Sequence, residues 1–113
     1  MIVKKFLKTK DACDVLFEYA NENATEVALV GDFNDWRNTL ELNTLAMEGF
    51  HQVTRPVNQF RSFPAWLPVG GLDKAFIRGR IEIQQARIVR TSLAREASDH
   101  LPLVIDFQLA PAN

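Results

Sequence analysis

Apolar side chains recur at every second position in parts of this chain, and this period of two most limits what the chain can fold into. The clearest case is the last such segment, residues 101–109, where Leu103, Ile105, Phe107 and Leu109 alternate with other residues. Alternation of this kind is typical of a strand with one face on a core. Further strands are expected over 72–77 and 81–90, and the apolar run 26–31, which ends at a glycine, is expected to be a buried strand. We therefore expect an α/β or α+β sheet protein.

The remaining segments are predicted by their turn residues and helical spacing. Residues 38–48 have a helix-like apolar pattern that Gly49 would end. Residues 54–71 contain three prolines and a Gly-Gly pair, so an irregular path is expected there. The stretch 12–20 fits a strand and a helix equally well, because its apolar residues satisfy both periods. A polar interval, 92–100, then precedes the last strand.

Composition limits the kind of protein. At 113 residues the chain is expected to form a single domain, 1–113, and 47% apolar residues are ordinary for a soluble fold. A net charge of −1 argues against a nucleic acid or a membrane attracted by bulk charge, and no membrane partner is expected. One cysteine excludes a disulfide framework. The basic first residues lack the apolar stretch of a signal peptide, so a cytoplasmic protein is expected.

The first cluster of chemically useful residues follows the strand expected over 26–31. Asp32 and Asn34 point the same way in an extended chain. A carboxylate accepts a proton from water and a carboxamide N–H donates to a phosphoryl oxygen, so the pair suits phosphate chemistry. The alternative is an Asx turn in which one of the two residues caps the following segment.

The second cluster precedes the last strand. Asp99 and His100 place an acid beside a group that works as a cation or as an acid–base catalyst near neutral pH. The alternative is that Asp99 and His100 are neighbours in a loop by chance and have no shared function. His51 has no flanking acid and is expected on a strand surface. The two clusters form one site only if the fold brings both strand ends to one edge.

Four segments in order carry a family resemblance. They are Val-Ala-Leu-Val-Gly-Asp-Phe-Asn-Asp-Trp-Arg-Asn (27–38), Phe-Pro-Ala-Trp-Leu-Pro (63–68), Leu-Asp-Lys-Ala-Phe (72–76) and 90–104, which contains Ser-Asp-His. Together they resemble the C-terminal part of the endonuclease/exonuclease/phosphatase family over residues 27–113, after a variable segment 1–26. The resemblance implies a partial two-sheet sandwich with one or two helices. It also implies a hydrolase, a nuclease or phosphodiesterase, that depends on Mg²⁺ or Mn²⁺.

The resemblance also implies a role for each matching residue. Asp32 would be the base that orients and deprotonates the attacking water, and Asn34 would hold the phosphoryl oxygens. Asp73 would fix the tautomer and charge of the catalytic histidine. Asp99 would be a metal-side carboxylate, and His100 would bind the phosphate and stabilise the transition state.

The family's longer N-terminal half, with its principal glutamate metal ligand, has no counterpart in this chain. We therefore expect a truncated or weakly active form that acts on a phosphoester substrate, nucleic acid included. The expected partner is either a second copy, in a homodimer that covers the apolar faces half of a two-sheet sandwich leaves exposed, or another chain that supplies the missing half.

A second resemblance concerns residues 4–36, which are similar to the glycogen-binding early-set module of starch and glycogen enzymes. In that case Trp36 and Trp66 would stack on sugar rings. A third alternative is an interaction domain without catalysis. Each tryptophan also has a structural explanation, in which Trp36 packs under the following helix and Trp66 covers the core.

Overall fold

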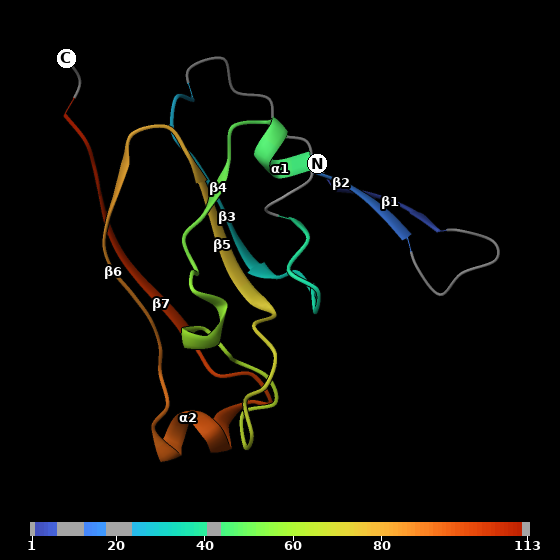
Figure 1. Cartoon of the computed structure of the whole chain (residues 1–113), viewed down its shortest axis with the longest axis vertical. Coiled ribbons are helices and arrows are strands. Elements are labelled where there is room, and N and C mark those ends of the chain that lie inside the picture. Colours follow the sequence, from blue (N-terminus) through green and yellow to red (C-terminus); the bar gives the residue numbers. More distant parts are fainter. Residues whose placement is uncertain (1, 7–12, 18–23, 41–43, 112–113) are drawn as a thin grey trace.

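Two small antiparallel sheets form the body of the protein in the computed structural model (Figure 1), which describes residues 2–6, 13–17, 24–40 and 44–111. The first sheet has the order β3-β5-β4, with β3 at Val27–Asp32, β5 at Asp73–Arg78 and β4 at His51–Gln52. The second sheet pairs β6, Ile81–Ile88, with β7, Leu103–Leu109. The strand pairs are antiparallel and the helices are few and short, so the fold is α+β.

The short elements complete this arrangement. Helix α1 spans Thr44–Met47, the 3₁₀ helix η2 spans Val57–Gln59 and helix α2 spans Ser92–Ala97. A further hairpin pairs β1, Ile2–Phe6, with β2, Cys13–Phe17. The ambiguous stretch 12–20 is thus a strand where it is described, over 13–17, and its other residues lie outside the described ranges.

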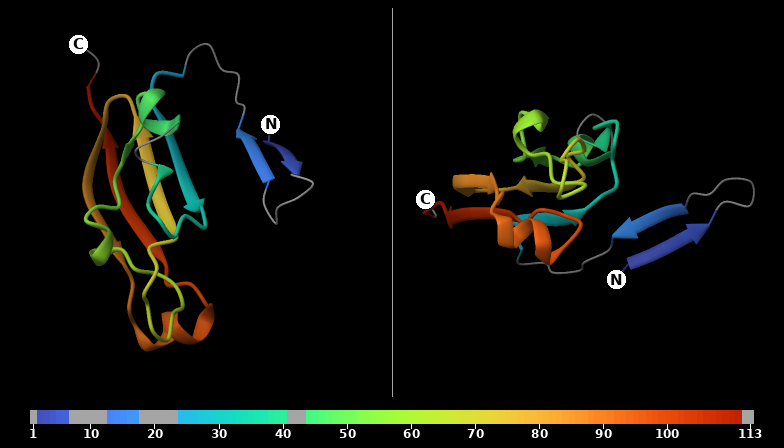
Figure 2. Two further views of the ribbon diagram at one scale, coloured as in Figure 1. Left: turned by 45° about the vertical axis from the view of Figure 1, so that its right-hand side comes forward. Right: turned by 90° about the horizontal axis from the view of Figure 1, so that it is seen from below.

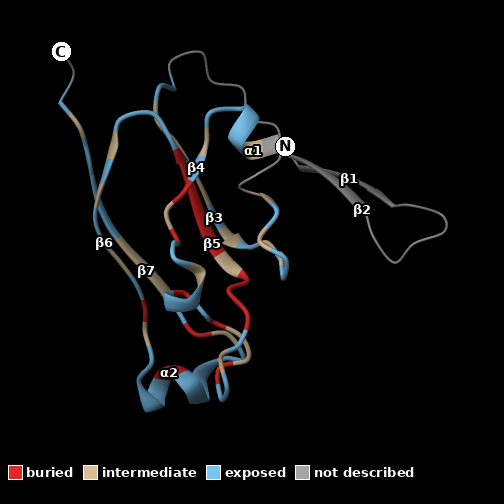
Figure 3. Ribbon diagram, viewed as in Figure 1, coloured by how far each residue is buried: buried red, intermediate tan, exposed pale blue. Residues whose placement is uncertain are grey.

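Strand β5 is the buried centre of the first sheet (Figure 3), because it has a hydrogen-bonded neighbour on each side. Its side chains alternate between two faces. On one face, Phe76 packs edge-on against Phe33, with ring centroids 5.2 Å apart, and the Lys74 Nζ donates to Asn38 Oδ1 at 2.5 Å. The segment that follows β3 therefore covers this face, and it also holds the positive charge of a buried lysine.

Strand β3 is only half-buried, so the expectation of a buried strand is wrong. Its residues alternate between partly buried and exposed, and Val30 is 61% exposed. The reason is its position at the edge of the sheet, where β5 is its one neighbour among the described strands. An apolar run alone does not distinguish such an edge from a central strand.

The helix expected over 38–48 is shorter than predicted. A second helix, α2, lies in a segment where no helix was predicted. In the 38–48 region α1 spans Thr44–Met47, whereas residues 41–43 lie outside the described ranges. Gly49 ends it as expected, with a φ of 83° and its N–H donating to the Ala46 carbonyl. Helix α2 lies in the polar interval, and its one clear signal is the side chain of Thr91, which accepts from the Ala94 N–H at 3.1 Å.

A compact apolar cluster joins the irregular segment 60–70 to the second sheet and to α2. Its buried members are Phe60, Ala65, Ile88, Ala94 and Leu101. The left view of Figure 2 shows the same arrangement, with the segment lying beside α2 at one end of the body. Residues 54–71 are irregular, as expected from their prolines, yet the cluster fixes their path.

Gly70 tests how tightly this irregular segment is packed. An added Cβ at Gly70 would overlap the ring of Trp36, whereas one at Gly31 would meet nothing within 4 Å. We expect Gly70→Ala to lower the free energy of unfolding by about 1–3 kcal/mol, because the ring must move. Gly31→Ala is the matched control and should cause no such loss. Urea denaturation measures both, and equal stabilities of the two variants would contradict the packing described here.

Candidate functional site

The pairing of β3 with β5 places two carboxylates side by side. Asp32 and Asp73 are direct partners in the antiparallel register, so their side chains lie on the same face of the sheet. The pairing continues just beyond them, because the Phe33 N–H donates to the Leu72 carbonyl at 3.0 Å. Both carboxylates are thereby held at the end of two hydrogen-bonded strands.

His100 reaches these carboxylates from the segment between α2 and β7. Its Nδ1 lies 2.7 Å from Asp73 Oδ2, and its Nε2 lies 3.6 Å from Asp32 Oδ2. The expectation that the two clusters meet at one edge is therefore met for Asp32 and His100, and Asp73 joins them. The 3.6 Å separation between His100 Nε2 and Asp32 Oδ2 is longer than a direct hydrogen bond. A water molecule or a ligand atom can contact both groups at this separation.

Ser62 is a member of the site that was not expected from the sequence. Its hydroxyl donates to Asp73 Oδ2 at 2.5 Å, and its backbone carbonyl accepts from the Leu101 N–H at 2.8 Å. Ser62 is fully buried, so it orients Asp73 and the chain next to His100 rather than acting as a nucleophile. The only local signal is its place beside the Phe63-Pro64 pair, and that signal does not specify a partner.

The environment of His100 favours the protonated ring. The hydrogen bond with Asp73 raises the pKa of His100, burial opposes this change, and the charges of Asp73, Asp32 and Asp99 add to the increase. The ring also lies against Phe63, with centroids 4.7 Å apart, and keeps a quarter of its side chain exposed. The site thus offers a partly exposed imidazole whose protonated form is favoured.

The side chain of Asp32 and the backbone of Asn34 form the Asx turn that was the alternative to phosphate binding by this pair. The Asn34 backbone N–H donates to Asp32 Oδ1 at 2.9 Å, and the φ of Asn34 is 50°. Its side-chain oxygen accepts from Trp36 Nε1 at 3.2 Å, an arrangement in which the NH₂ group is the donor that the amide presents to a ligand. The turn and a role in ligand binding are therefore compatible.

Asp35 anchors the loop that carries Asn34. It accepts from the backbone N–H groups of Thr39 and Leu40, both at 3.1 Å. Burial acts to raise the pKa of Asp35, but these hydrogen bonds and the charge of Lys74 outweigh it, so the pKa is lowered. The loop is consequently fixed to β5 through charge as well as through Phe33.

The donor set does not form a complete divalent-metal site. Within the described ranges no three His, Cys, Asp or Glu side chains cluster as metal ligands do. Asp99 has an exposed side chain, and its backbone carbonyl accepts from the Ala65 N–H at 2.7 Å. Mg²⁺ requires near-octahedral oxygen coordination, to which Asp32 and Asp99 would contribute only part.

Neither tryptophan lies where its structural explanation predicts. Trp36 is about half exposed and packs edge-on against Phe63, at 6.0 Å between ring centroids, and beside Gly70. The idea that Trp66 covers the core is wrong, because it is 77% exposed at the tip of its loop. His51 is exposed on β4, as expected.

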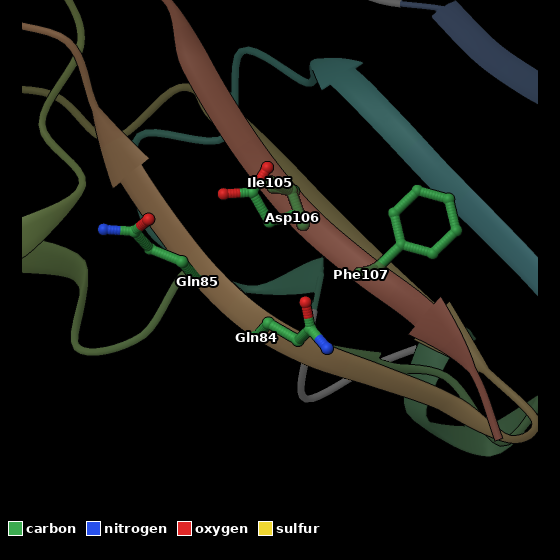
Figure 4. A pocket seen from close by; sticks show the side chains of 5 residues that line it. All are labelled: Gln84, Gln85, Ile105, Asp106 and Phe107. Atoms are coloured by element: carbon green, nitrogen blue, oxygen red, sulfur yellow. The ribbon is translucent and has the colours of Figure 1, made fainter.

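A shallow hollow on the second sheet has no part in this site. Figure 4 shows its lining on β6 and β7, made by Gln84, Gln85, Ile105, Asp106 and Phe107. Its single ionisable side chain is Asp106, so it offers no cation to a phosphate.

Comparison with protein-family models, with curated proteins and with solved structures finds no match to this chain. Among the described residues, none of the helices is both long and apolar enough to cross a membrane.

Replacing Asp73 tests the electrostatics of His100. We expect Asp73→Asn to lower the pKa of His100, because the largest cause of its increase is the hydrogen bond with this carboxylate. NMR titration of the imidazole protons measures the change. In the parent protein the raised pKa adds stability that is complete below about pH 6.5, the value of an unfolded histidine, and is lost as the pH rises through the folded pKa.

Asp106→Asn is the matched control, since it removes the same charge from β7. It should leave both the titration of His100 and this loss of stability unchanged. If Asp73→Asn titrates like the parent protein, Asp73 does not hold the ring.

Proposed function

We propose that this chain carries the phosphate-handling half of a phosphoester hydrolase of the endonuclease/exonuclease/phosphatase type. The observation that supports this best is the His100 ring held between Asp73 and Asp32, which come from adjacent strands. The sequence motifs that resemble this family contain the same three residues. The motifs and the geometry of the site therefore lead to one cluster.

Each group has a definite role in phosphoester hydrolysis. His100, fixed by Asp73, places positive charge toward a phosphoryl oxygen, and Asn34 supplies an N–H donor beside it. Asp32 accepts a proton from water as the water oxygen bonds to phosphorus. The bond from phosphorus to the leaving oxygen breaks, and that oxygen takes a proton from solvent.

The charge of the site explains why the hydrolytic activity of the chain alone is expected to be weak. Among the described residues of the site, three carboxylates, those of Asp32, Asp73 and Asp99, outnumber the imidazole of His100, so the local charge opposes the approach of a phosphate. The divalent ion that the resemblance implies would offset this charge. The described residues do not supply a full set of ligands for it, so we propose that a partner completes the site.

Hydrolysis of bis-p-nitrophenyl phosphate tests the assignment. We expect slow release of p-nitrophenolate that depends on added Mg²⁺ or Mn²⁺ and falls by about 100-fold or more in His100→Ala and in Asp32→Ala. His51→Ala is the matched control, because it removes an exposed imidazole from the edge strand β4. Release that persists at the parent rate in His100→Ala would exclude this function.

The carbohydrate-binding alternative is supported by the exposure of Trp36 and Trp66 alone. One side of Trp36 is already covered by Gly70, which limits the ring available for a sugar. On the phosphoester assignment, we expect the protein to remain in solution when glycogen is sedimented. Sedimentation with glycogen that disappears in Trp36→Ala would instead assign the carbohydrate module.

A further inference from the structure

Trp36 lies beside the candidate site and keeps about half of its side chain open. The side chain is 51% exposed. Its only hydrogen-bonding group, the indole N–H, already donates to Asn34 Oδ1 at 3.2 Å. The ring therefore offers a ligand its aromatic surface and no further polar group.

We propose that Trp36 is a stacking subsite of the candidate site, which binds a planar aromatic ring carried by the phosphoester. The proposal rests on the proposed function and deepens it, because it names the substrate class. That class is a phosphate ester of a nucleoside or of an aryl alcohol, since each of these carries such a ring next to the phosphate.

Two residues contact both Trp36 and the groups that handle phosphate. The Asn34 carboxamide accepts from Trp36 with its oxygen, and its nitrogen, bonded to the same carbon, is the donor available to a phosphoryl oxygen. The Phe63 ring packs against Trp36 with centroids 6.0 Å apart and against His100 with centroids 4.7 Å apart. These separations limit the distance between the indole and the imidazole. A phosphate at His100 and a ring at Trp36 can therefore belong to one small molecule.

The indole is held in place before a ligand binds. Its N–H is fixed to Asn34, and Phe63 meets it edge-on at an interplanar angle of 78°. An added Cβ at Gly70 would overlap the six-membered part of the indole, so Gly70 lies close against one side of it. These contacts leave the ring little conformational freedom to lose when it stacks on a ligand. Because one side is covered, we expect the subsite to take a single ring.

The charge of the site favours a ligand with an uncharged binding group. The carboxylates of Asp32, Asp73 and Asp99 oppose a phosphate, so affinity must come from a part of the substrate that does not react. Stacking of two aromatic rings supplies such affinity without any charge for salt to screen. A sugar on the indole would need partners for its hydroxyl groups, and the indole N–H is not available for them.

NMR titration tests the proposal, because the two tryptophans of the chain give separate indole N–H signals. The probes are methyl phosphate, phenyl phosphate and thymidine 5′-monophosphate, each with Mg²⁺ present. We expect all three to shift the imidazole signals of His100, and only the two ring-bearing probes to shift the indole signal of Trp36. The indole of Trp66, which is 77% exposed, is the internal control and should not shift. The tighter of the two ring-bearing probes distinguishes a nucleoside from an aryl ester.

Variants of Trp36 test whether the ring itself causes the preference. We expect the ring-bearing probes to bind the parent protein about tenfold or more tightly than methyl phosphate, and Trp36→Ala to bind all three alike. Trp36→Phe keeps an aromatic ring but has no donor for Asn34, so part of the preference should remain. The matched control is Phe107→Ala, which truncates a comparably exposed aromatic residue on β7 and should bind as the parent does. Urea denaturation confirms that each variant is folded.

The outcomes separate this proposal from the proposed function. Ring-bearing probes that shift His100 but bind no more tightly than methyl phosphate would overturn the stacking subsite and leave the phosphoester function standing. Equal shifts of the Trp36 and Trp66 signals, or a preference lost alike in Trp36→Phe and Trp36→Ala, would also overturn the subsite. If thymidine shifts Trp36 while none of the phosphates shifts His100, the aromatic subsite is retained and the phosphoester function is overturned.

Discussion

The pairing of β3 with β5 is the constraint on which the site depends. Antiparallel register sets Asp32 directly opposite Asp73, and two carboxylates at that separation repel each other unless a cation lies between them. His100 provides that cation, with one ring nitrogen near each acid. The segment before β7 is therefore bound to the first sheet by charge, and the raised pKa of His100 follows from the same contact.

Buried residues hold the candidate site in place in two ways. The apolar cluster around Ala65 and Leu101 fixes the irregular segment and the approach to His100, and Ser62 adds a buried hydrogen bond to Asp73.

The candidate site was predictable to the extent that its chemistry is local. The Asp32–Asn34 spacing and the Asp99–His100 pair identify polar groups at strand ends, and alternation identifies most strands. Helix α2 escaped prediction because six residues with one capping threonine give little periodic signal. Ser62 escaped because its importance comes from Asp73, eleven residues further along the chain.

The sequence by itself determined strands β3, β5, β6 and β7, the turn chemistry after β3 and the residue types available for phosphate chemistry, because these depend on side-chain periodicity and on near neighbours. Only the tertiary structure decided that β3 is an edge strand, that His100 reaches Asp73 and that Trp66 faces outward. Each of these depends on which strand or loop lies alongside, and a linear pattern does not encode such long-range contacts.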